Sequence, residues 1–365
     1  MNLCVLLVLF ETLTFSPHPD STIRGVYINP YQAGNKEYLN RVFAKADSGL
    51  INTIVVDFKS DYGFLAYASN VALAKKLWAI KRFIDIDNVI ERAARHNVKL
   101  VARIVCFRDD YLSQDKKYAI LDDSGEIWYD NKGIAWTNPY QEKVGDYLID
   151  ITKELVERGI TSVAYDYIRF PSDGEVWRIR LTKVMGKRYE PIITFLKKVR
   201  NAVDVEIGVC VFGFAVWQQL KAEGQDIEKM ADYIDVLYPM LYPSHFGWNF
   251  KREVNEYWRN YWIYFDSVQE AFDKLPGYIK VVPFVQGFEF GADTFNSDYV
   301  FSQIHGASAA HAHGFIVWHA GGDYTISWPA LSWAHNAVLK QSALMSLNSR
   351  MKARGQRYQL PNPHQ

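Results

Sequence analysis

The residues best suited to chemistry lie in one short segment, Thr161–Gly174, with the sequence TSVAYDYIRFPSDG. It reads as an apolar strand that ends at Asp166, followed by Arg169 and a loop containing proline and glycine. An ionised carboxylate is tolerated at the end of an apolar strand when it is paired or functional. The C-terminal ends of parallel strands are also where α/β folds bind ligands. Asp166 is therefore the leading candidate for a catalytic carboxylate.

Two further carboxyl groups follow apolar runs in a similar way. Asp57 fits a second catalytic carboxylate or a ligand of sugar hydroxyls, and it fits equally a structural ion pair with Lys59 or Arg103. Glu289 lies between two phenylalanines, and apolar neighbours raise the pKa of a carboxyl group as a general acid requires. A loop carboxylate that faces solvent explains Glu289 equally well.

This set of residues is suited to cleaving glycosidic bonds. That reaction needs two carboxyl groups that flank the bond, one protonated and one ionised. Arg103 and Arg169 are the expected charge partners that keep Asp166 ionised. A purely structural ion pair between Asp166 and either arginine is the alternative.

Aromatic and polar side chains at other strand ends would bind the sugar. Aromatic residues make up 15% of the chain, with 23 Tyr and 11 Trp, although an aromatic-rich core would explain this composition too. The expected substrate-binding residues are Tyr27, Arg103, Arg169, Tyr238, Tyr242, His245, Gln286 and Trp318.

The elements that position these residues alternate along the chain. Amphipathic helical patterns separate eight apolar strands, which predicts parallel βαβ units and an α/β fold of the (β/α)8 TIM-barrel class with long βα loops. An open doubly wound sheet usually shows a glycine-rich phosphate turn after its first strand, and this chain has none there. The predicted strands are Arg24–Asn29, Ile51–Phe58, Val98–Val105, Ile160–Asp166, Val205–Phe212, Tyr233–Tyr238, Ile279–Gln286 and Gly314–His319.

Capping residues predict several helix boundaries. Asn138 followed by proline predicts the start of a helix that Gly159 ends. Asp87 and Ser297 predict two further helix starts, and Gly314 ends the second of these helices before the last strand.

The alternation within the fourth strand predicts the direction of Asp166. Ser162, Ala164 and Asp166 share one face, whereas Val163 and Tyr165 share the other. Small residues suit the crowded interior of a barrel, so Asp166 is expected to point inward at its mouth.

The chain divides into three parts. Residues 1–20 form a weak leader segment, residues 21–345 the barrel, and residues 346–365 a polar tail. The apolar run Leu3–Phe10 is too short to span a membrane but long enough for the core of an export signal. We therefore expect a secreted or cell-envelope protein, with a cytoplasmic one as the alternative.

Charge and cysteine content exclude several classes. The net charge of +0 gives no electrostatic case for binding nucleic acid or an anionic membrane. The cysteines at positions 4, 106 and 210 form no metal or disulfide pattern, and Cys106 and Cys210 read as buried free thiols. His311 and His313 fall before the last strand, on the wrong side of a barrel for a metal site. No metal or organic cofactor is therefore expected.

Four motifs together resemble a bacterial and archaeal domain of unknown function that is grouped with glycoside hydrolases and thought to be related to the α-amylase-like barrels. The resemblance runs from about Arg24 to about Trp333, and it implies a TIM barrel that acts on a glycan, often in an exported protein. The motifs that carry it are Arg24–Tyr27, Val56–Gly63, Tyr165–Gly174 and Tyr238–His245.

The likeness to the α-amylase-like barrels is incomplete. Those enzymes carry an aspartate nucleophile at the end of strand four, a position that matches Asp166. They place an arginine two residues before it, where this chain has Ala164, and a glutamate acid on strand five, where this chain has none. The identity of the general acid and the choice between retention and inversion therefore stay open.

The sequence predicts a glycoside hydrolase that cleaves O-glycosidic bonds of a poly- or oligosaccharide by a two-carboxylate mechanism with Asp166, Asp57 and Glu289. A non-catalytic glycan-binding barrel is the first alternative, because strand five lacks an acid. A barrel enzyme acting on a sugar phosphate, with phosphate near Gly321–Gly322, is the second. The sequence indicates neither the sugar nor the oligomeric state.

Overall fold

The structure is a computed structural model that describes residues 22–181, 187–251 and 253–336. The predicted leader of residues 1–20, with its apolar run Leu3–Phe10, lies outside these ranges. So does the predicted tail of residues 346–365. Ile23–Ala337 form one compact unit, to which the following description applies.

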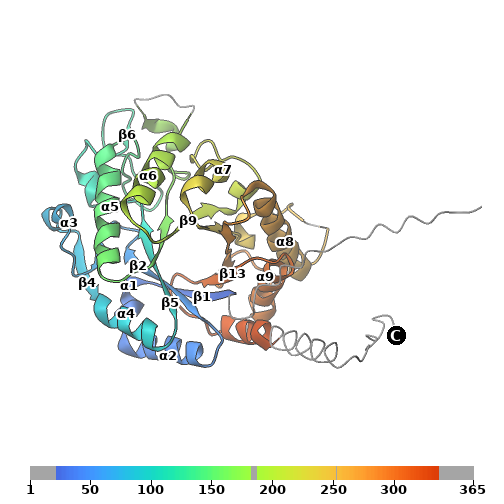
Figure 1. The fold of residues 1–365 in the computed structure, drawn as a ribbon. Helices are drawn as coiled ribbons and strands as arrows, with labels where there is room; N and C mark the ends of the chain where they lie inside the picture. The colour runs from blue at the N-terminus through green and yellow to red at the C-terminus, as the bar shows by residue number, and fades with distance from the viewer. Residues whose placement is uncertain (1–21, 182–186, 252, 337–365) are drawn as a thin grey trace, which may run out of the picture. The chain divides into compact units, whose positions relative to one another are not determined.

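Eight parallel strands of the described chain form a closed ring (Figure 1). The ring closes because β1 pairs with β13 on one side and with β2 on the other. This arrangement confirms the predicted (β/α)8 barrel. In order around the ring, the strands are β1 (Ile23–Ile28), β2 (Thr53–Lys59), β5 (Lys99–Val105), β7 (Ser162–Asp166), β9 (Glu206–Phe212), β10 (Val236–Met240), β12 (Phe284–Gln286) and β13 (Gly314–Trp318).

Helices surround the strands, as in other barrels of this class (Figure 1). Residues 327–336 are also helical. The other helices are α1 (Pro30–Ala33), α2 (Lys36–Asp47), α3 (Ala72–Lys76), α4 (Ile86–Arg95), α5 (Glu142–Glu157), α6 (Tyr189–Ala202), α7 (Ile227–Met230), α8 (Glu256–Lys274) and α9 (Ser297–Ala309).

Short strands and 3-10 helices lie in the loops. The strands β3 (Leu65–Tyr67) and β4 (Ile80–Ile84) extend the sheet beyond β2, and β11 (Lys280–Val281) pairs with β10. The strands β6 (Leu121–Asp122) and β8 (Ile179–Arg180) pair with each other. The 3-10 helices are η2 (Leu112–Gln114), η3 (Val176–Arg178), η4 (Gly213–Val216), η5 (Ala231–Tyr233) and η6 (Pro243–His245).

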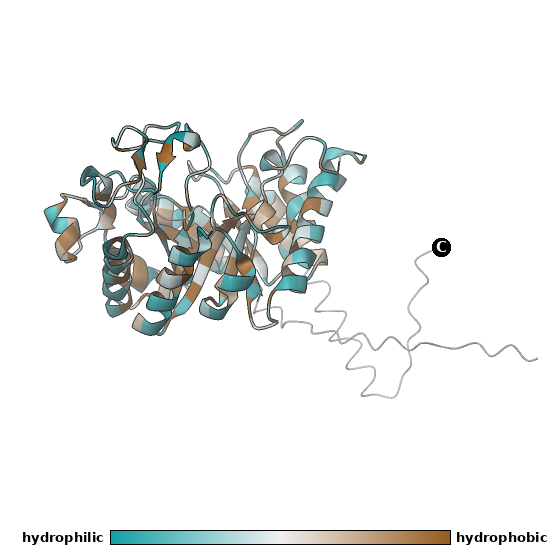
Figure 2. Cartoon of the chain, turned by 90° about the horizontal axis from the view of Figure 1, so that it is seen from above, coloured by the Kyte–Doolittle hydropathy of each residue, from teal (hydrophilic) through white to brown (hydrophobic). Residues whose placement is uncertain are grey.

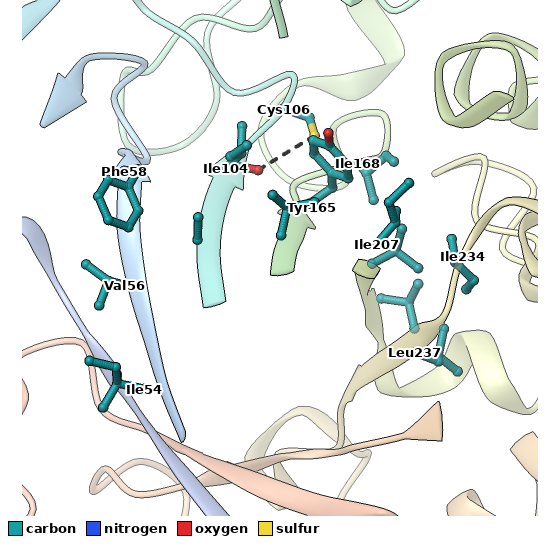
Figure 3. Close-up of a cluster of buried hydrophobic side chains, with 14 of the residues drawn as sticks. Ile54, Val56, Phe58, Ile104, Cys106, Tyr165, Ile168, Ile207, Ile234 and Leu237 are labelled. Carbon is teal, nitrogen blue, oxygen red and sulfur yellow. Dashed lines mark hydrogen bonds between the residues drawn. The ribbon is translucent and has the colours of Figure 1, made fainter. Parts of the chain in front are cut away.

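Alternation along the strands separates two apolar layers. On β2, the side chains of Ile54, Val56 and Phe58 belong to the larger cluster, between the barrel and its helices (Figure 3). Val55 belongs to the second cluster, inside the barrel, so Asp57 shares this inward face. β2 therefore places the Asp57 carboxyl group inside the barrel, while its outward-facing side chains stay apolar.

The helices bury one face each. On α5, the predicted stripe of Val144, Leu148, Ile151 and Leu155 is buried. Figure 2 shows the same division across the molecule, with hydrophilic residues on the outer sides of the helices and hydrophobic residues toward the strands. Burial of apolar area at about 25 cal/mol per Å² is the main force that holds the helices against the barrel.

The barrel interior is filled by side chains, so it is a core and not a pore. Ala164, Cys210, Tyr238 and Ile316 pack there. The Tyr238 ring fits because residue 208 on the neighbouring strand β9 is glycine. A Cβ atom on Gly208 would lie 2.3 Å from this ring. The functional groups therefore lie above this core, at the C-terminal ends of the strands.

Some boundaries differ from the sequence predictions. The sixth strand continues to Met240, two residues beyond the predicted end. The seventh is interrupted near Pro283 and appears as β11 and β12. The helix expected to start at Asn138 starts at Glu142, because the Asn138 side chain instead accepts a hydrogen bond from the Tyr140 N–H in a preceding turn.

Other local predictions are confirmed. Ser297 is the first residue of α9, and Asn296 caps it. α4 begins at Ile86, one residue before the predicted Asp87. Cys106 and Cys210 are buried free thiols. Within the described ranges, no helix is both long and apolar enough to cross a membrane.

Candidate active site

One buried arginine organises the mouth of the barrel. The Arg103 guanidinium donates from Nε to Asp166 Oδ2 at 2.8 Å and from Nη1 to Asp57 Oδ1 at 2.6 Å. Its Nη2 contacts Asp61 Oδ1 at 2.8 Å and Asp166 Oδ2 at 2.7 Å. Three carboxyl groups, from two strands and one turn, therefore share a single positive charge.

Strand register explains why these groups meet. Asp57 on β2 lies opposite Arg103 on β5, and Arg103 lies opposite Ala164 on β7. Asp166 follows Ala164 by two residues, so it points inward one step nearer the mouth. The predicted direction of Asp166 therefore agrees with the structure.

The backbone after Asp166 is strained. Tyr167 adopts a φ of 48°, in the left-handed region that favours glycine. This conformation lets the Tyr167 N–H donate to Asp166 Oδ1 at 2.6 Å. Strain of this kind clusters at functional sites, where it holds a side chain in one orientation.

A tight turn carries Asp61 to the cluster. Gly63 in this turn has a φ of 97°, and a Cβ atom there would lie 2.2 Å from Asp109 Oδ1. The turn therefore requires glycine for both its conformation and its contact with Asp109. Arg108 also donates from Nη1 to the Asp61 carbonyl at 3.1 Å, which fixes the backbone at this position.

Two aromatic rings line the cluster. The Tyr27 ring stacks on Trp318 with a centroid separation of 3.7 Å, and the Tyr27 hydroxyl donates to Asp57 Oδ2 at 2.6 Å. The guanidinium carbon of Arg103 lies 5.0 Å from the Trp318 ring centroid. Trp318 is half-buried, so part of its surface stays available at the mouth.

Burial determines the charge of Asp57. It raises the pKa of Asp57 to about 7, with Arg103 opposing the change and Asp61 adding to it. For Arg103, burial alone would lower the pKa, but the three carboxyl groups raise it well above its ordinary value. Burial thus favours the protonated form of Asp57, whereas Arg103 and the Tyr27 hydroxyl favour its ionised form.

A second buried pair lies next to the turn that carries Asp61. Lys59 Nζ lies 2.8 Å from Asp109 Oδ2, and it donates to the Val105 carbonyl at 2.8 Å. Lys59 therefore pairs with Asp109, and of the two structural pairs considered for Asp57 only that with Arg103 is present.

Arg169 is buried beside the cluster without joining it. Its Nη1 donates to the Phe170 carbonyl at 3.0 Å and to Ser172 Oγ at 3.2 Å. Among the described residues, no carboxylate lies within ion-pairing distance of it, so the expected Arg169–Asp166 ion pair is absent there. Its guanidinium instead lies over the rings of Trp136, Tyr167 and Phe212.

The tyrosines expected to bind sugar lie at different depths. Tyr238 lies in the barrel core and not at the mouth, because β10 continues two residues beyond it. Tyr242 is buried near the mouth, and its hydroxyl has no hydrogen-bond partner within the described chain. Burial, with a contribution from Asp166, raises the pKa of Tyr242. His245 is exposed, with its ring centroid 5.4 Å from that of Tyr242.

Gln286 and Glu289 also lie apart from the cluster. Gln286 is fully buried and accepts from the Ser244 N–H, while its amide donates to the carbonyls of Phe288 and Phe290. It therefore holds two loops together. Glu289 is exposed, so the apolar surroundings expected for a general acid are not present.

The structure thus brings together five of the predicted residues, namely Tyr27, Asp57, Arg103, Asp166 and Trp318. It adds Asp61, which lies two residues beyond the end of β2. The signal that could have found it is its spacing, because Asp57 and Asp61 flank the end of one strand.

The structure also bears on the phosphate site considered near Gly321–Gly322 and on metal binding. Within the described ranges, no group of three or more His, Cys, Asp or Glu side chains could hold a metal ion. At Gly321–Gly322, the Gln32 side chain occupies the space where a Cβ atom on Gly322 would lie, and Tyr38 donates to the Gly322 carbonyl at 2.8 Å. These glycines pack a loop and do not form an open phosphate cradle.

A family model described as "Putative glycosyl hydrolase domain" matches residues 25–324. The chain belongs to this family. The match covers all of the barrel strands except part of β1, together with every member of the Arg103 cluster. Membership agrees with the predicted resemblance and with a glycosidase of undetermined substrate.

Three solved structures are similar to this glycosyl hydrolase family member, and the first two agree with its fold. The glycoside hydrolase domain of PgaB (BpsB) from Bordetella bronchiseptica is 10% identical, with a TM-score of 0.58, over 82% of this chain and 94% of that one. A chitinase from Bacteroides thetaiotaomicron is 12% identical, with a TM-score of 0.50, over 85% and 96%. A hypothetical protein from Ruminiclostridium thermocellum ATCC 27405 is 30% identical, with a TM-score of 0.48, over 51% and 96%. No curated protein matches the sequence.

Proposed function

We propose that this protein hydrolyses O-glycosidic bonds of a poly- or oligosaccharide with two carboxyl groups at the barrel mouth. The observation that carries the proposal is the sharing of Arg103 among Asp57, Asp61 and Asp166. Such a cluster contains both an ionised and a protonated carboxyl group, which is the combination that glycoside cleavage needs.

Asp166 is the nucleophile or base. Its Oδ2 accepts from Arg103, and its Oδ1 accepts from the Tyr167 N–H. Donors on both oxygens stabilise the ionised form, and the strained backbone at Tyr167 holds the carboxylate in place. An ionised and oriented carboxylate is what attack on the anomeric carbon, or on a water beside it, requires.

Both oxygens of Asp57 also accept hydrogen bonds, from Arg103 and Tyr27, but burial outweighs these donors and raises its pKa to about 7. Asp57 is therefore the acid, with a proton to donate near neutral pH. Asp61 is the competing donor, since its side chain is 34% exposed and that of Asp57 only 3%. Because Asp61 and Asp166 both contact Arg103 Nη2, their nearest oxygens lie at most about 5.5 Å apart, which is below the roughly 6.5–9.5 Å of inverting enzymes.

The test compares reducing-end release from a broad polysaccharide panel by the wild type and by Asp166→Asn. We expect the variant to lose activity by orders of magnitude, about 10⁴-fold or more. Asp150→Asn is the matched control, because Asp150 is an exposed carboxyl group on α5. Equal activity of wild type and Asp166→Asn would remove Asp166 from the mechanism.

Aryl glycosides with acidic leaving groups show whether Asp57 or Asp61 donates the proton. Such leaving groups depart without protonation, so the acid variant keeps its activity on them while losing activity on polysaccharide. We expect this pattern for Asp57→Asn. The same pattern in Asp61→Asn, with none in Asp57→Asn, would assign the proton to Asp61 instead.

A non-catalytic glycan-binding barrel is the second candidate. The observation that favours it is the end of β9, where Phe212 leads directly into Gly213–Val216 and provides no carboxyl group. Retained binding of a polysaccharide by a wild type that releases no reducing ends from any member of the panel would establish this alternative.

A further inference from the structure

A groove of about 690 Å³ lies beside the proposed active site. Its volume is within the range of ligand-binding pockets, which is roughly 300–1,000 Å³. Aromatic rings make up half of its lining, and charged or polar side chains make up most of the rest. The lining residues are Tyr31, Tyr62, Phe64, Lys76, Leu77, Lys81, Phe83, Asp110, Tyr111 and Gln114.

The aromatic rings are unusually exposed for their size. Tyr31 is 62% exposed and Tyr62 is 53% exposed, and the Tyr31 ring lies 4.7 Å from that of Phe83. Phe83 in turn packs edge-on against the buried ring of Phe64. The exposed rings are thus held from below by a buried one, which gives a rigid apolar surface open to solvent.

A further exposed aromatic residue lies next in the chain to a lining residue of this groove. Trp78, which follows the lining residue Leu77, is 86% exposed. Its φ is 55°, so its backbone is in the left-handed region that large side chains rarely adopt. A strained and almost fully exposed tryptophan contributes little to folding, and such positions are associated with binding.

The groove and the Arg103 cluster use consecutive residues of one turn. Tyr62 lines the groove, and the preceding residue, Asp61, contacts Arg103. The Asp110 N–H donates to the Tyr62 carbonyl at 3.0 Å, so two lining residues are joined through the backbone. Both loops follow barrel strands at their C-terminal ends, which places the groove on the same face as the proposed reaction.

We propose that this groove binds sugar rings of the substrate that are remote from the cleaved bond, so the substrate is a polysaccharide and not a short glycoside. This inference rests on the proposed function. Aromatic rings pack against the C–H faces of sugars, while Lys76, Lys81, Asp110 and Gln114 are in place to bind hydroxyl groups. A polymer that crosses the mouth meets this surface because the groove and the cluster share the Asp61–Tyr62 turn.

Binding is measured without hydrolysis in an Asp166→Asn background, by affinity electrophoresis against the same polysaccharide panel. We expect at least one polysaccharide to be retained, and Tyr31→Ala, Trp78→Ala or Phe83→Ala each to weaken its binding by about tenfold. Tyr278→Ala is the matched control, because Tyr278 is 66% exposed but precedes β11, at the opposite end of the barrel.

Hydrolysis gives the second readout. In the active protein, the same groove variants are expected to raise KM for the polysaccharide by about tenfold and to leave the rate on a short aryl glycoside unchanged. Equal losses on both substrates would overturn the proposal, because the variants would then be disturbing the reaction centre or the fold.

Two binding results would also overturn it. One is retention of a polysaccharide that none of the groove variants weakens. The other is that no polysaccharide tested is retained. If the wild type then self-associates and Tyr31→Ala abolishes that association, the groove binds a second copy of the chain and not a polysaccharide. Retention that depends on the groove, without any hydrolysis, would support the groove and contradict the proposed function, so the two failures are distinguishable.

Discussion

The protonation of Asp57 has a direct consequence for stability. The fold raises its pKa from 3.8 to about 7, mainly through burial. A carboxyl group whose pKa is higher in the folded state stabilises the fold while it is protonated, and this contribution is lost as pH rises from about 4 to about 7. Asn is neutral at every pH and similar in shape to Asp, so Asp57→Asn should keep this stabilising contribution as pH rises.

The magnitude follows from the pKa difference. Each pKa unit corresponds to about 1.4 kcal/mol, so a change from 3.8 to about 7 corresponds to about 4 kcal/mol. The side chain is almost fully buried, so little of this is lost to solvent screening. Relative to the wild type, Asp57→Asn should therefore gain about 4 kcal/mol in free energy of unfolding between roughly pH 4 and pH 8.

Urea unfolding followed by tryptophan fluorescence measures this difference across the pH range. Asp150→Asn, which changes an exposed carboxyl group, should stay within about 0.5 kcal/mol of the wild type throughout. A constant difference between Asp57→Asn and the wild type from acid to neutral pH would refute the reasoning, because it would mean that Asp57 ionises normally in the fold.

The same cluster yields further predictions. If Asp57 is the acid, kcat/KM on a polysaccharide should fall above about pH 7, and Tyr27→Phe should move this fall to higher pH, because the Tyr27 hydroxyl lowers the pKa of Asp57. An unchanged pH profile in that variant would contradict the role of the bond. Arg103→Met should abolish activity and destabilise the fold by about 3–5 kcal/mol at neutral pH, since it leaves buried carboxyl groups without their cation. Lys59→Met should lower the free energy of unfolding in urea by a similar amount at neutral pH, because it removes the cation that pairs with Asp109. The loss should be smaller in acid, because burial raises the pKa of Asp109 and the group becomes neutral there. A loss independent of pH would contradict this explanation.

The sequence was sufficient to predict the barrel and the centre of its mouth. Strand alternation in Ser162–Asp166 predicted the inward direction of Asp166, and Arg103 was the expected charge partner of this carboxylate. The apolar run before Asp57 predicted a further carboxyl group at a strand end. These predictions succeed because the side-chain period of a strand is two, so a strand end and a direction follow from the residues alone.

Loops account for most of what the sequence did not predict. Tyr238 was expected at the mouth as the last residue of the predicted strand Tyr233–Tyr238, but β10 continues to Met240. The exposure of Glu289 and the approach of Asp61 to Arg103 depend on loop paths, which strand periodicity does not determine. The groove combines residues from several loops, and no sequence motif marks it.

The turn that contains Asp61 and Tyr62 connects proton binding at Asp57 with ligand binding in the groove. Its first residue contributes to the pKa of Asp57, and its second lines the groove. Consecutive α-carbons are held about 3.8 Å apart, so a ligand that displaces one residue displaces the other. Any coupling through this turn is reciprocal by thermodynamic linkage: if occupancy of the groove changes the proton affinity at the centre of the barrel, then pH changes the affinity of the groove by the same factor.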